Sequence, residues 1–210
     1  MEGCPDHGMG GLGQMAHAVL RDSRRNERSG EARLFLGLNT QPDRPFPLVG
    51  YIGFPTAPGA WRACGGDAAV FLAAAVRSLQ AQPVPEGAAF GPEYRHLQRM
   101  LRQDAIALSL SAYLVLPQND PGGKALLDNL VEGYLLPEDL ELSPAARVTD
   151  LVFAAERSGG RLIVLAPADA PDEEALPLDP ADTTGQATLV LDLLAELLDA
   201  QYTWNQKVFG

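Results

Sequence analysis

A long stretch of the chain without a charged residue runs from Ala105 to Asn119. It is too short to span a bilayer, which takes about 20 consecutive apolar residues. From Ile106 to Leu116 the side chains alternate between two faces with a period of two, which predicts a β-strand. A buried helix that continues from Tyr94 is the alternative allowed by the same residues. This segment therefore predicts a core element and argues against a membrane span.

Shorter periodic segments on both sides of this stretch predict a mixture of helices and strands. Apolar residues at helical spacing indicate helices, and short apolar runs bounded by Gly and Pro indicate strands. Helices are predicted at 14–26, 67–81, 92–103, 124–135 and 186–201, and strands at 33–38, 48–54, 106–116 and 161–166.

A further helix is predicted to begin at Ser143 and Pro144 and to end at Gly159. Ser is a common N-cap residue, Pro suits the first turn, and Gly often follows the last turn. The core face of this helix would hold four residues at helical spacing, which are Val148, Leu151, Val152 and Ala155.

The expected fold is a single compact domain of the α+β or α/β class, with about six helices around a small mixed sheet of about four strands. Residues 1–13 are rich in Gly and are predicted to form a flexible arm. They match the dinucleotide pattern at Gly8, Gly10 and Gly13, but the seven residues before them leave no room for the buried strand of that motif, so a flexible arm is favoured and dinucleotide binding is a remote alternative. Residues 14–210 form the domain, with an acidic loop at 168–185 and an aromatic C-terminal tail at 202–210.

Charge is distributed unevenly along the chain, whose net charge is −11. Residues 1–119 hold eleven basic and ten acidic groups, whereas residues 120–210 hold five basic and seventeen acidic groups. Four of these eleven basic residues lie at the end of the first predicted helix, at Arg21, Arg24, Arg25 and Arg28. Because a nucleic-acid-binding protein usually carries a larger basic surface, specific nucleic-acid binding is not expected.

The cysteines and histidines supply one weak metal hypothesis. Cys4 and His7 have the spacing C-x-x-H, and His17 and Cys64 could complete a tetrahedral zinc site. Structural zinc sites normally have two closely spaced ligand pairs, and the second pair is missing here. No cofactor is therefore predicted, and zinc is kept as an alternative. Two cysteines are too few for a disulfide framework, and no signal peptide is indicated, so a cytoplasmic location is expected.

Several residues outside the apolar core pattern suggest contact with a partner. Aromatic residues are enriched in the cores of interfaces, and like charges on one helix face would be relieved by a basic partner. The candidates are Phe54 and Trp61 in a loop, Asp192, Glu196 and Asp199 on the last helix, the tail residues Tyr202, Trp204 and Phe209, and the four arginines above.

These observations predict a non-catalytic partner-binding protein, such as an accessory subunit, an adaptor or a chaperone-like factor. The expected partner is a protein with a basic surface, or a second copy of the chain, in which the arginines of one copy meet the acidic half of another. The alternative is a small enzyme, possibly dependent on a metal ion, whose site is assembled from scattered groups such as His17, His96, Cys64 and carboxylates.

Overall fold

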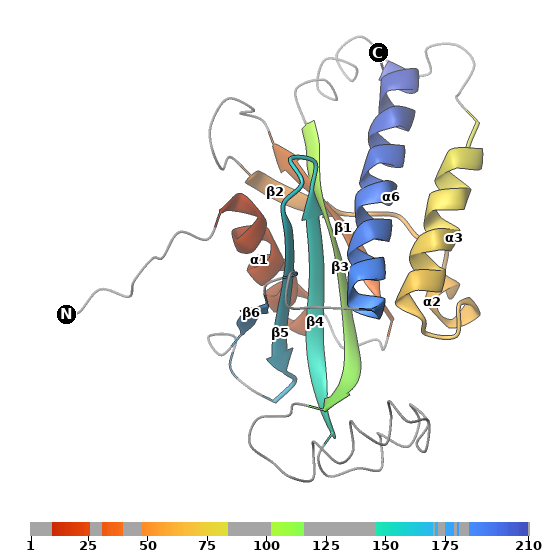
Figure 1. The fold of residues 1–210 in the computed structure, drawn as a ribbon. Coiled ribbons are helices and arrows are strands. Elements are labelled where there is room, and N and C mark those ends of the chain that lie inside the picture. The colour runs from red at the N-terminus through yellow and green to blue at the C-terminus, as the bar shows by residue number, and fades with distance from the viewer. Residues whose placement is uncertain are drawn as a thin grey trace, which may run out of the picture.

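A single antiparallel sheet of six strands forms the centre of the computed structural model and is covered by helices on both faces (Figure 1). The structure describes residues 10–25, 31–39, 48–83, 102–115, 146–169, 171, 175–178, 180 and 185–209. One face of the sheet is covered by α1 and the other by α3 and α6. The predicted mixed α+β class is thus confirmed.

The described helices are α1 (Gly11–Arg25), α2 (Ala60–Ala63), α3 (Ala68–Ala81) and α6 (Gln186–Phe209). The strands are β1 (Arg33–Asn39), β2 (Leu48–Gly53), β3 (Arg102–Val115), β4 (Ala146–Glu156), β5 (Arg161–Pro167) and β6 (Leu176–Leu178). None of the helices in this described part of the chain is both long and apolar enough to cross a membrane.

The order of the strands across the sheet is β2-β1-β3-β4-β5-β6, and every neighbouring pair is antiparallel. The prediction of a mixed sheet of about four strands was therefore wrong in detail, and the described residues contain four helices where about six were predicted for the whole chain. Strand β3 lies beside β1, not beside β2, so the chain leaves the edge of the sheet after β2 and returns to its centre at β3. Helix α3 lies in this crossover connection, which places it over one face of the sheet.

The prediction of a strand over 106–116 is confirmed by β3, which pairs with both β1 and β4. Its two faces contact different helices. Ile106 and Leu108 belong to the apolar cluster under α3 and α6, and Ala105 and Ala107 belong to the cluster under α1. All four are at most 2% exposed, so this strand is buried on both faces.

Side chains on the two faces of the sheet differ in size. The α3 and α6 face is built largely from Leu, Ile and Phe, whereas the α1 face includes Ala105, Ala107, Ala154 and Ala166. Helix α1 also has small residues on its buried face, at Gly11, Gly13 and Ala16. Small side chains on both partners allow the helix backbone to lie close to the sheet. The larger residues on the other face fill the space beneath two helices.

The helix predicted between Ser143 and Gly159 is wrong, because residues 146–156 form strand β4. Leu151, Phe153 and Ala155 contact one apolar cluster, and Val152 and Ala154 contact the other. A strand that is covered on both faces is apolar without interruption, and such a run fits helical spacing as well as alternation. Gly159 ends no helix. It adopts φ 97° in the tight turn that joins β4 to β5, where its amide donates to the carbonyl of Glu156 at 3.0 Å.

The ends of two helices also differ from the prediction. Helix α1 begins at Gly11, so Gly11 to Gly13 form its buried first turn and do not belong to the predicted arm, of which residues 1–9 lie outside the described residues. Helix α6 continues through the predicted aromatic tail to Phe209. The cause is that Leu197, Gln201 and Trp204 continue the helical spacing beyond the predicted end.

Other predictions are partly confirmed. The cap of α3 is confirmed, because an Asp67 side-chain oxygen accepts from the Val70 amide at 3.0 Å. The loop predicted at 168–185 contains strand β6, which pairs with β5. The helix predicted at 124–135 lies outside the described residues. So does the helix at 92–103, apart from Arg102 and Gln103, which belong to β3.

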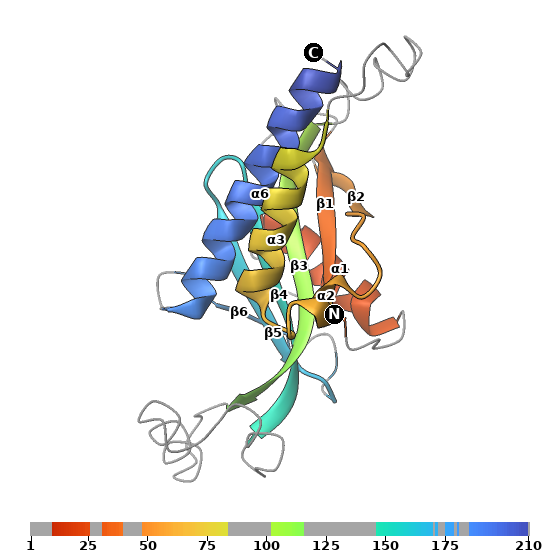
Figure 2. The same cartoon turned by 90° about the vertical axis from the view of Figure 1, so that its right-hand side faces the viewer.

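Helices α3 and α6 lie side by side over their face of the sheet (Figure 2). The connection from β2 to α3 includes the short helix α2 and passes on the side of α3 that faces away from α6. This arrangement brings one edge of the sheet, a loop and two helices together around the same space.

Candidate binding pocket

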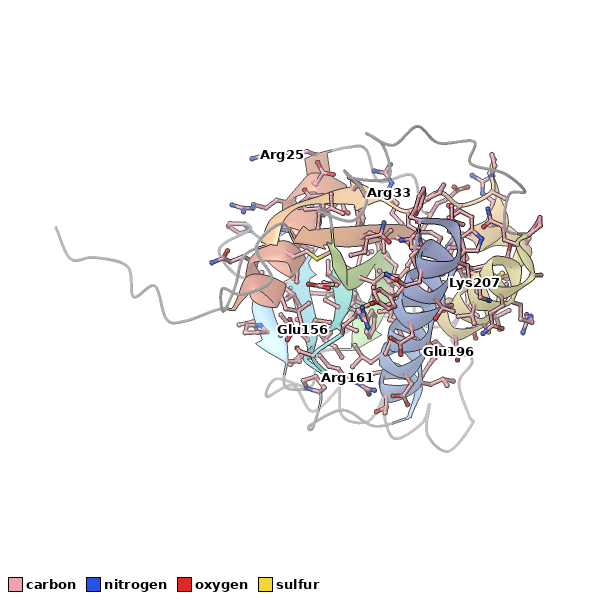
Figure 3. The ribbon with its side chains drawn as sticks, turned by 90° about the horizontal axis from the view of Figure 1, so that it is seen from above. Arg25, Arg33, Glu156, Arg161, Glu196 and Lys207 are labelled. Atoms are coloured by element: carbon pink, nitrogen blue, oxygen red, sulfur yellow. The ribbon has the colours of Figure 1, made fainter. Side chains whose placement is uncertain are left out.

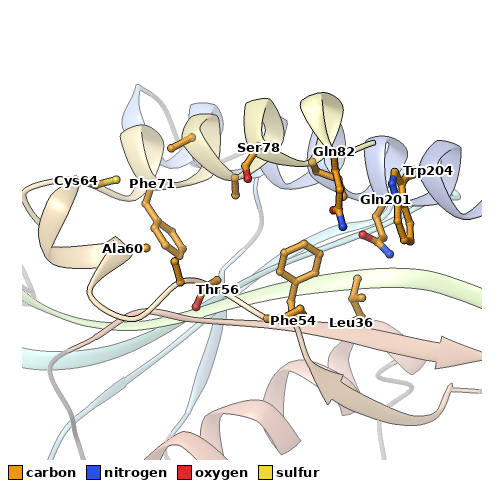
Figure 4. A pocket seen from close by; sticks show the side chains of 15 residues that line it. Leu36, Phe54, Thr56, Ala60, Cys64, Phe71, Ser78, Gln82, Gln201 and Trp204 are labelled. Atoms are coloured by element: carbon orange, nitrogen blue, oxygen red, sulfur yellow. The ribbon is translucent and has the colours of Figure 1, made fainter. Parts of the chain in front are cut away.

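A pocket with a volume of about 400 Å³ lies between α3, the C-terminal half of α6, strand β1 and the loop from β2 to α2 (Figure 4). In this view Cys64 lies at one end of the pocket, Gln201 and Trp204 lie at the other, and Phe54 lies between the sheet and α3. The described lining residues are Leu36, Phe54, Pro55, Thr56, Ala57, Ala60, Cys64, Phe71, Ala74, Ala75, Ser78, Leu79, Gln82, Gln201 and Trp204.

The chemistry of this pocket is apolar and uncharged. None of the 15 described lining residues carries a charge. Its polar side-chain groups are the hydroxyls of Thr56 and Ser78 and the amides of Gln82 and Gln201, together with the Cys64 thiol and the Trp204 indole N–H. The volume lies within the range of pockets that bind ligands, about 300–1,000 Å³. Because an ionised group placed here would lose hydration without gaining an opposite charge, the pocket suits an uncharged and mostly apolar group.

The wall formed by the loop and α2 is held by backbone and ring contacts. The amide of Phe54 donates to the carbonyl of Leu34 at 2.7 Å, which fixes the start of the loop against β1. The rings of Trp61 and Phe71 meet edge to face, with centroids 5.5 Å apart and an interplanar angle of 84°. Gly66 adopts φ 73° beside the indole of Trp61, a conformation that favours glycine. This wall is therefore attached to both the sheet and α3.

The opposite end is held by a chain of amide side chains. Gln201 donates to the Asn205 side-chain oxygen at 3.4 Å, and the Asn205 amide donates to Gln103 at 2.7 Å. These bonds connect α6 to the beginning of β3. They orient the side chain of Gln201 at this end of the pocket.

A second, shallower hollow of about 350 Å³ adjoins the pocket on the outer side of α3 and α6. Three residues line both spaces, namely Leu79, Gln82 and Trp204. The second hollow is more polar, because Glu196, Asp199 and Lys207 line it together with Gln80, Ala200 and Thr203. An apolar pocket thus lies next to a charged hollow, with Trp204 between them.

Three of the aromatic residues selected from the sequence are brought together by the fold. Phe54 and Trp204 line the pocket, and Trp61 packs against the same apolar cluster. The other two lie elsewhere. The ring of Tyr202 is covered by the guanidinium of Arg157 at 3.5 Å from its centroid, and Phe209 is only 8% exposed.

The acidic residues of α6 have different surroundings. Asp192 makes an ion pair with Arg161 at 2.6 Å. Glu196 and Asp199 are both exposed and line the shallower hollow. Figure 3 shows Glu196 and Lys207 on α6, across the sheet from Arg25 on α1. The acidic face of α6 and the arginine-rich end of α1 are therefore separate surfaces of the molecule.

One of the four arginines contacts the acidic half of its own chain. The Nε of Arg24 donates to Asp150 at 2.9 Å, and its guanidinium also donates to the carbonyl of Pro167 at 2.6 Å. Ser111 donates to the other oxygen of Asp150 at 2.6 Å. Arg24 thus connects α1 to the sheet and is not available to a partner. Arg21 and Arg25 are exposed, and Arg28 lies outside the described residues.

Two of the four residues of the zinc hypothesis, His17 and Cys64, are not brought together. His17 lies on α1, whereas Cys64 packs against the cluster on the opposite face of the sheet. Cys4 and His7 lie outside the described residues. Within the described part of the chain, no three His, Cys, Asp or Glu residues are grouped as metal ligands.

His17 provides a prediction about the dependence of stability on pH. Burial lowers its pKa below the ordinary value of 6.5, and the positive charge of Arg21 lowers the pKa further. Its Nε2 is buried and has no hydrogen-bond partner among the described residues. Below pH 6.5 the unfolded chain therefore binds a proton that the folded chain still excludes. Stability from this group is complete above that pH and is lost as the pH falls toward the folded pKa.

We expect urea unfolding to show a larger loss of stability between about pH 7.5 and about pH 5.5 for the wild type than for His17→Leu. The other histidines, His7 and His96, are retained in both proteins, so the difference reports on His17. Equal losses in the two proteins would contradict the burial of this imidazole.

Comparison of the chain with protein-family models, with curated proteins and with solved structures finds no match. Its function is therefore argued from the geometry of the site.

Sequence reasoning selected Phe54 and Trp204 as partner contacts and Cys64 as a metal or catalytic candidate, and it missed the other lining residues. Thr56, Ser78 and Gln82 are exposed polar residues without a motif. Leu36 and Ala75 have the spacing of ordinary core residues. Because these residues come from β1, a loop and α3, only the tertiary fold brings them to one pocket.

Proposed function

We propose that this chain is a non-catalytic partner-binding protein that takes an uncharged, mostly apolar group of its partner into the pocket between α3, α6 and the β2–α2 loop. The accessory-subunit, adaptor and chaperone-like functions all fit this description. A cytoplasmic location is retained as part of the proposal.

The observation that carries the proposal is the composition of the pocket. Its described lining combines aromatic and aliphatic side chains with neutral hydroxyls and amides, and it contains no charged residue. Pockets of this kind gain affinity mainly from apolar burial and use a few polar groups for orientation. Trp and Phe side chains can bury about 150–250 Å² each, so Phe54 and Trp204 offer a large apolar contact area.

Of the groups named for the enzyme alternative, only Cys64 is in the described lining of the pocket, so a reaction at this pocket would use its thiol. A thiol needs a base or a nearby positive charge to become a reactive thiolate. Among the described residues that line the pocket there is neither an imidazole nor a carboxylate, and there is no cation. This favours binding over catalysis.

The negative charge of the second half of the chain favours a partner with a basic surface. Residues 120–210 have a net charge of −12, and Glu196 and Asp199 are exposed next to the pocket. Self-association through Arg21 and Arg25 is the other form of the proposal. Because α1 and α6 lie on opposite faces of the sheet, such a contact would join different surfaces of two copies and would extend from copy to copy.

The proposal is tested by protection of Cys64 from alkylation. We expect the neutral dye Nile red to bind with increased fluorescence and to slow the reaction of Cys64 with N-ethylmaleimide at least about threefold, because the thiol lines the occupied pocket. The reaction is followed by mass spectrometry of the Cys64 peptide in the wild-type protein.

Cys4 in the same chain is the internal reference, and its rate of alkylation should not change. Equal slowing at both cysteines would indicate a general effect of the dye. Binding without any protection of Cys64 would place the dye elsewhere and would refute the proposed site.

A further inference from the structure

We infer that the natural occupant is a protein segment in which an apolar anchor side chain, seated in the pocket, is followed closely by a positively charged residue that lies in the adjoining acidic hollow. This inference rests on the proposed function and specifies the partner of the same site. It is carried by the geometry of α6, by the wall that the two hollows share, and by the charges around them.

The exposed side of α6 presents one continuous row of residues to the second hollow. Glu196, Asp199, Ala200, Thr203, Trp204 and Lys207 line this hollow. Their spacings of three and four residues place them on one face of the helix. The row begins with two carboxylates and ends with an ammonium group. These ends are about 16 Å apart along the axis, because eleven residues separate Glu196 from Lys207.

The two hollows are close enough to bind one segment. Leu79 and Gln82 of α3 and Trp204 of α6 line both, so an occupant of the pocket passes directly over these residues to reach the acidic end. Along α6, Asp199 is five residues before Trp204, a rise of about 7.5 Å. This distance is comparable to the reach from one side chain of an extended peptide to the side chain two residues away.

The charges favour a cation in the second hollow. Glu196 and Asp199 are exposed. Within the described part of the chain, their carboxylates form no ion pair and accept no hydrogen bond from another side chain. Asp192 on the same helix is paired with Arg161 and does not compete for the occupant. Lys207 faces the hollow from the far end of the row and would disfavour a cation there. The positive residue is therefore expected beside Glu196 and Asp199.

A protein segment can fill both the apolar pocket and the adjoining acidic hollow, whereas a small apolar molecule can fill only the pocket. The pocket alone would accept an uncharged molecule, but such a molecule would leave the acidic hollow empty. A peptide can supply an aromatic or aliphatic side chain for the pocket, backbone groups for Gln82 and Gln201, and Lys or Arg for the carboxylates. The combination of anchor and charge is thus the expected basis of specificity.

The experiment measures displacement of Nile red from the full-length protein by three short peptides. Each has a central tryptophan, and the peptides differ only in whether lysine, glutamine or glutamate flanks it. We expect affinity to decrease in that order and the preference for lysine to weaken as salt is raised. In the double variant Glu196→Gln, Asp199→Asn the lysine peptide should lose about three- to tenfold in affinity. The glutamine peptide should change by less than about twofold.

Asp192→Asn is the matched control. It removes a carboxylate of the same helix, but this carboxylate is paired with Arg161 and does not line the second hollow. It should leave the order of the peptides and the affinity of the lysine peptide unchanged. Equal affinities for the three peptides, or a lysine preference that survives in the double variant, would overturn the inference. Binding of the dye with no displacement by any peptide would also overturn it and would leave the pocket as a site for a small apolar molecule. Failure of the dye to bind would instead refute the proposed function.

Discussion

Replacing Asp150 with alanine is expected to lower the free energy of unfolding by about 3–5 kcal/mol. Asp150 lies on β4 and accepts hydrogen bonds from Arg24 and from Ser111. The side chains of Arg24 and Asp150 are only 10% and 7% exposed. The substitution would leave a buried guanidinium without the carboxylate that it contacts, and water cannot replace that carboxylate fully at this depth.

Asp192→Ala is the control for this prediction. Asp192 also contacts an arginine, at 2.6 Å, but its side chain is 54% exposed and that of Arg161 is 36% exposed. Ion pairs at this exposure contribute about 0–1 kcal/mol. Urea unfolding of both variants, with the free energies extrapolated to water, gives the comparison. A loss for Asp150→Ala no larger than that for Asp192→Ala would show that the contact between α1 and β4 does not stabilise the fold.

The contact between Arg24 and Asp150 also shows what the distribution of charge in the sequence could reveal. The sequence indicated an arginine-rich helix end and an acidic second half, and the arginines were expected to meet the acidic half of another copy, whereas Arg24 contacts the acidic half of its own chain. This contact could not be assigned from the sequence, because four arginines and seventeen acidic residues offer many pairs of equal merit.

The fold could be predicted where one period dominates a segment. Helix α3 had a clear apolar stripe, and β3 had an alternating pattern that was preferred over a buried helix; both elements were found close to the expected places. Strand β4 was mistaken for a helix because α1 covers one of its faces while α3 and α6 cover the other. Leu151 to Ala155 are consequently all apolar, and a continuous apolar run carries no period of its own. The order of the strands also depends on contacts between distant residues that local patterns do not specify.

The candidate site could be predicted only in part. Phe54 and Trp204 stood out as aromatic residues outside the expected core pattern, and both line the pocket. Tyr202 stood out for the same reason but lies under Arg157, because it projects from a different side of α6. Because α6 extends to Phe209, helical spacing separates these two aromatics, whereas the helix predicted to end at Gln201 did not include them.

The central claim is that the pocket between α3 and α6 is the binding site, and it is tested most directly by filling that pocket. Ser78 lies on α3, is exposed and lines the pocket. In Ser78→Trp the new indole can enter the apolar space at little cost to the fold, because the site is open to solvent. Val70→Trp is the matched control, since Val70 is 49% exposed on the same helix and does not line the pocket.

The decisive measurement is the affinity for Nile red of the wild type, Ser78→Trp and Val70→Trp, after circular dichroism has shown that all three proteins are folded. Occupation of the pocket by the indole is predicted to weaken binding at least about tenfold in Ser78→Trp, which corresponds to about 1.4 kcal/mol, and to leave Val70→Trp within about twofold of the wild type. Equal affinities in the folded Ser78→Trp and Val70→Trp proteins would contradict the assignment of this pocket as the binding site.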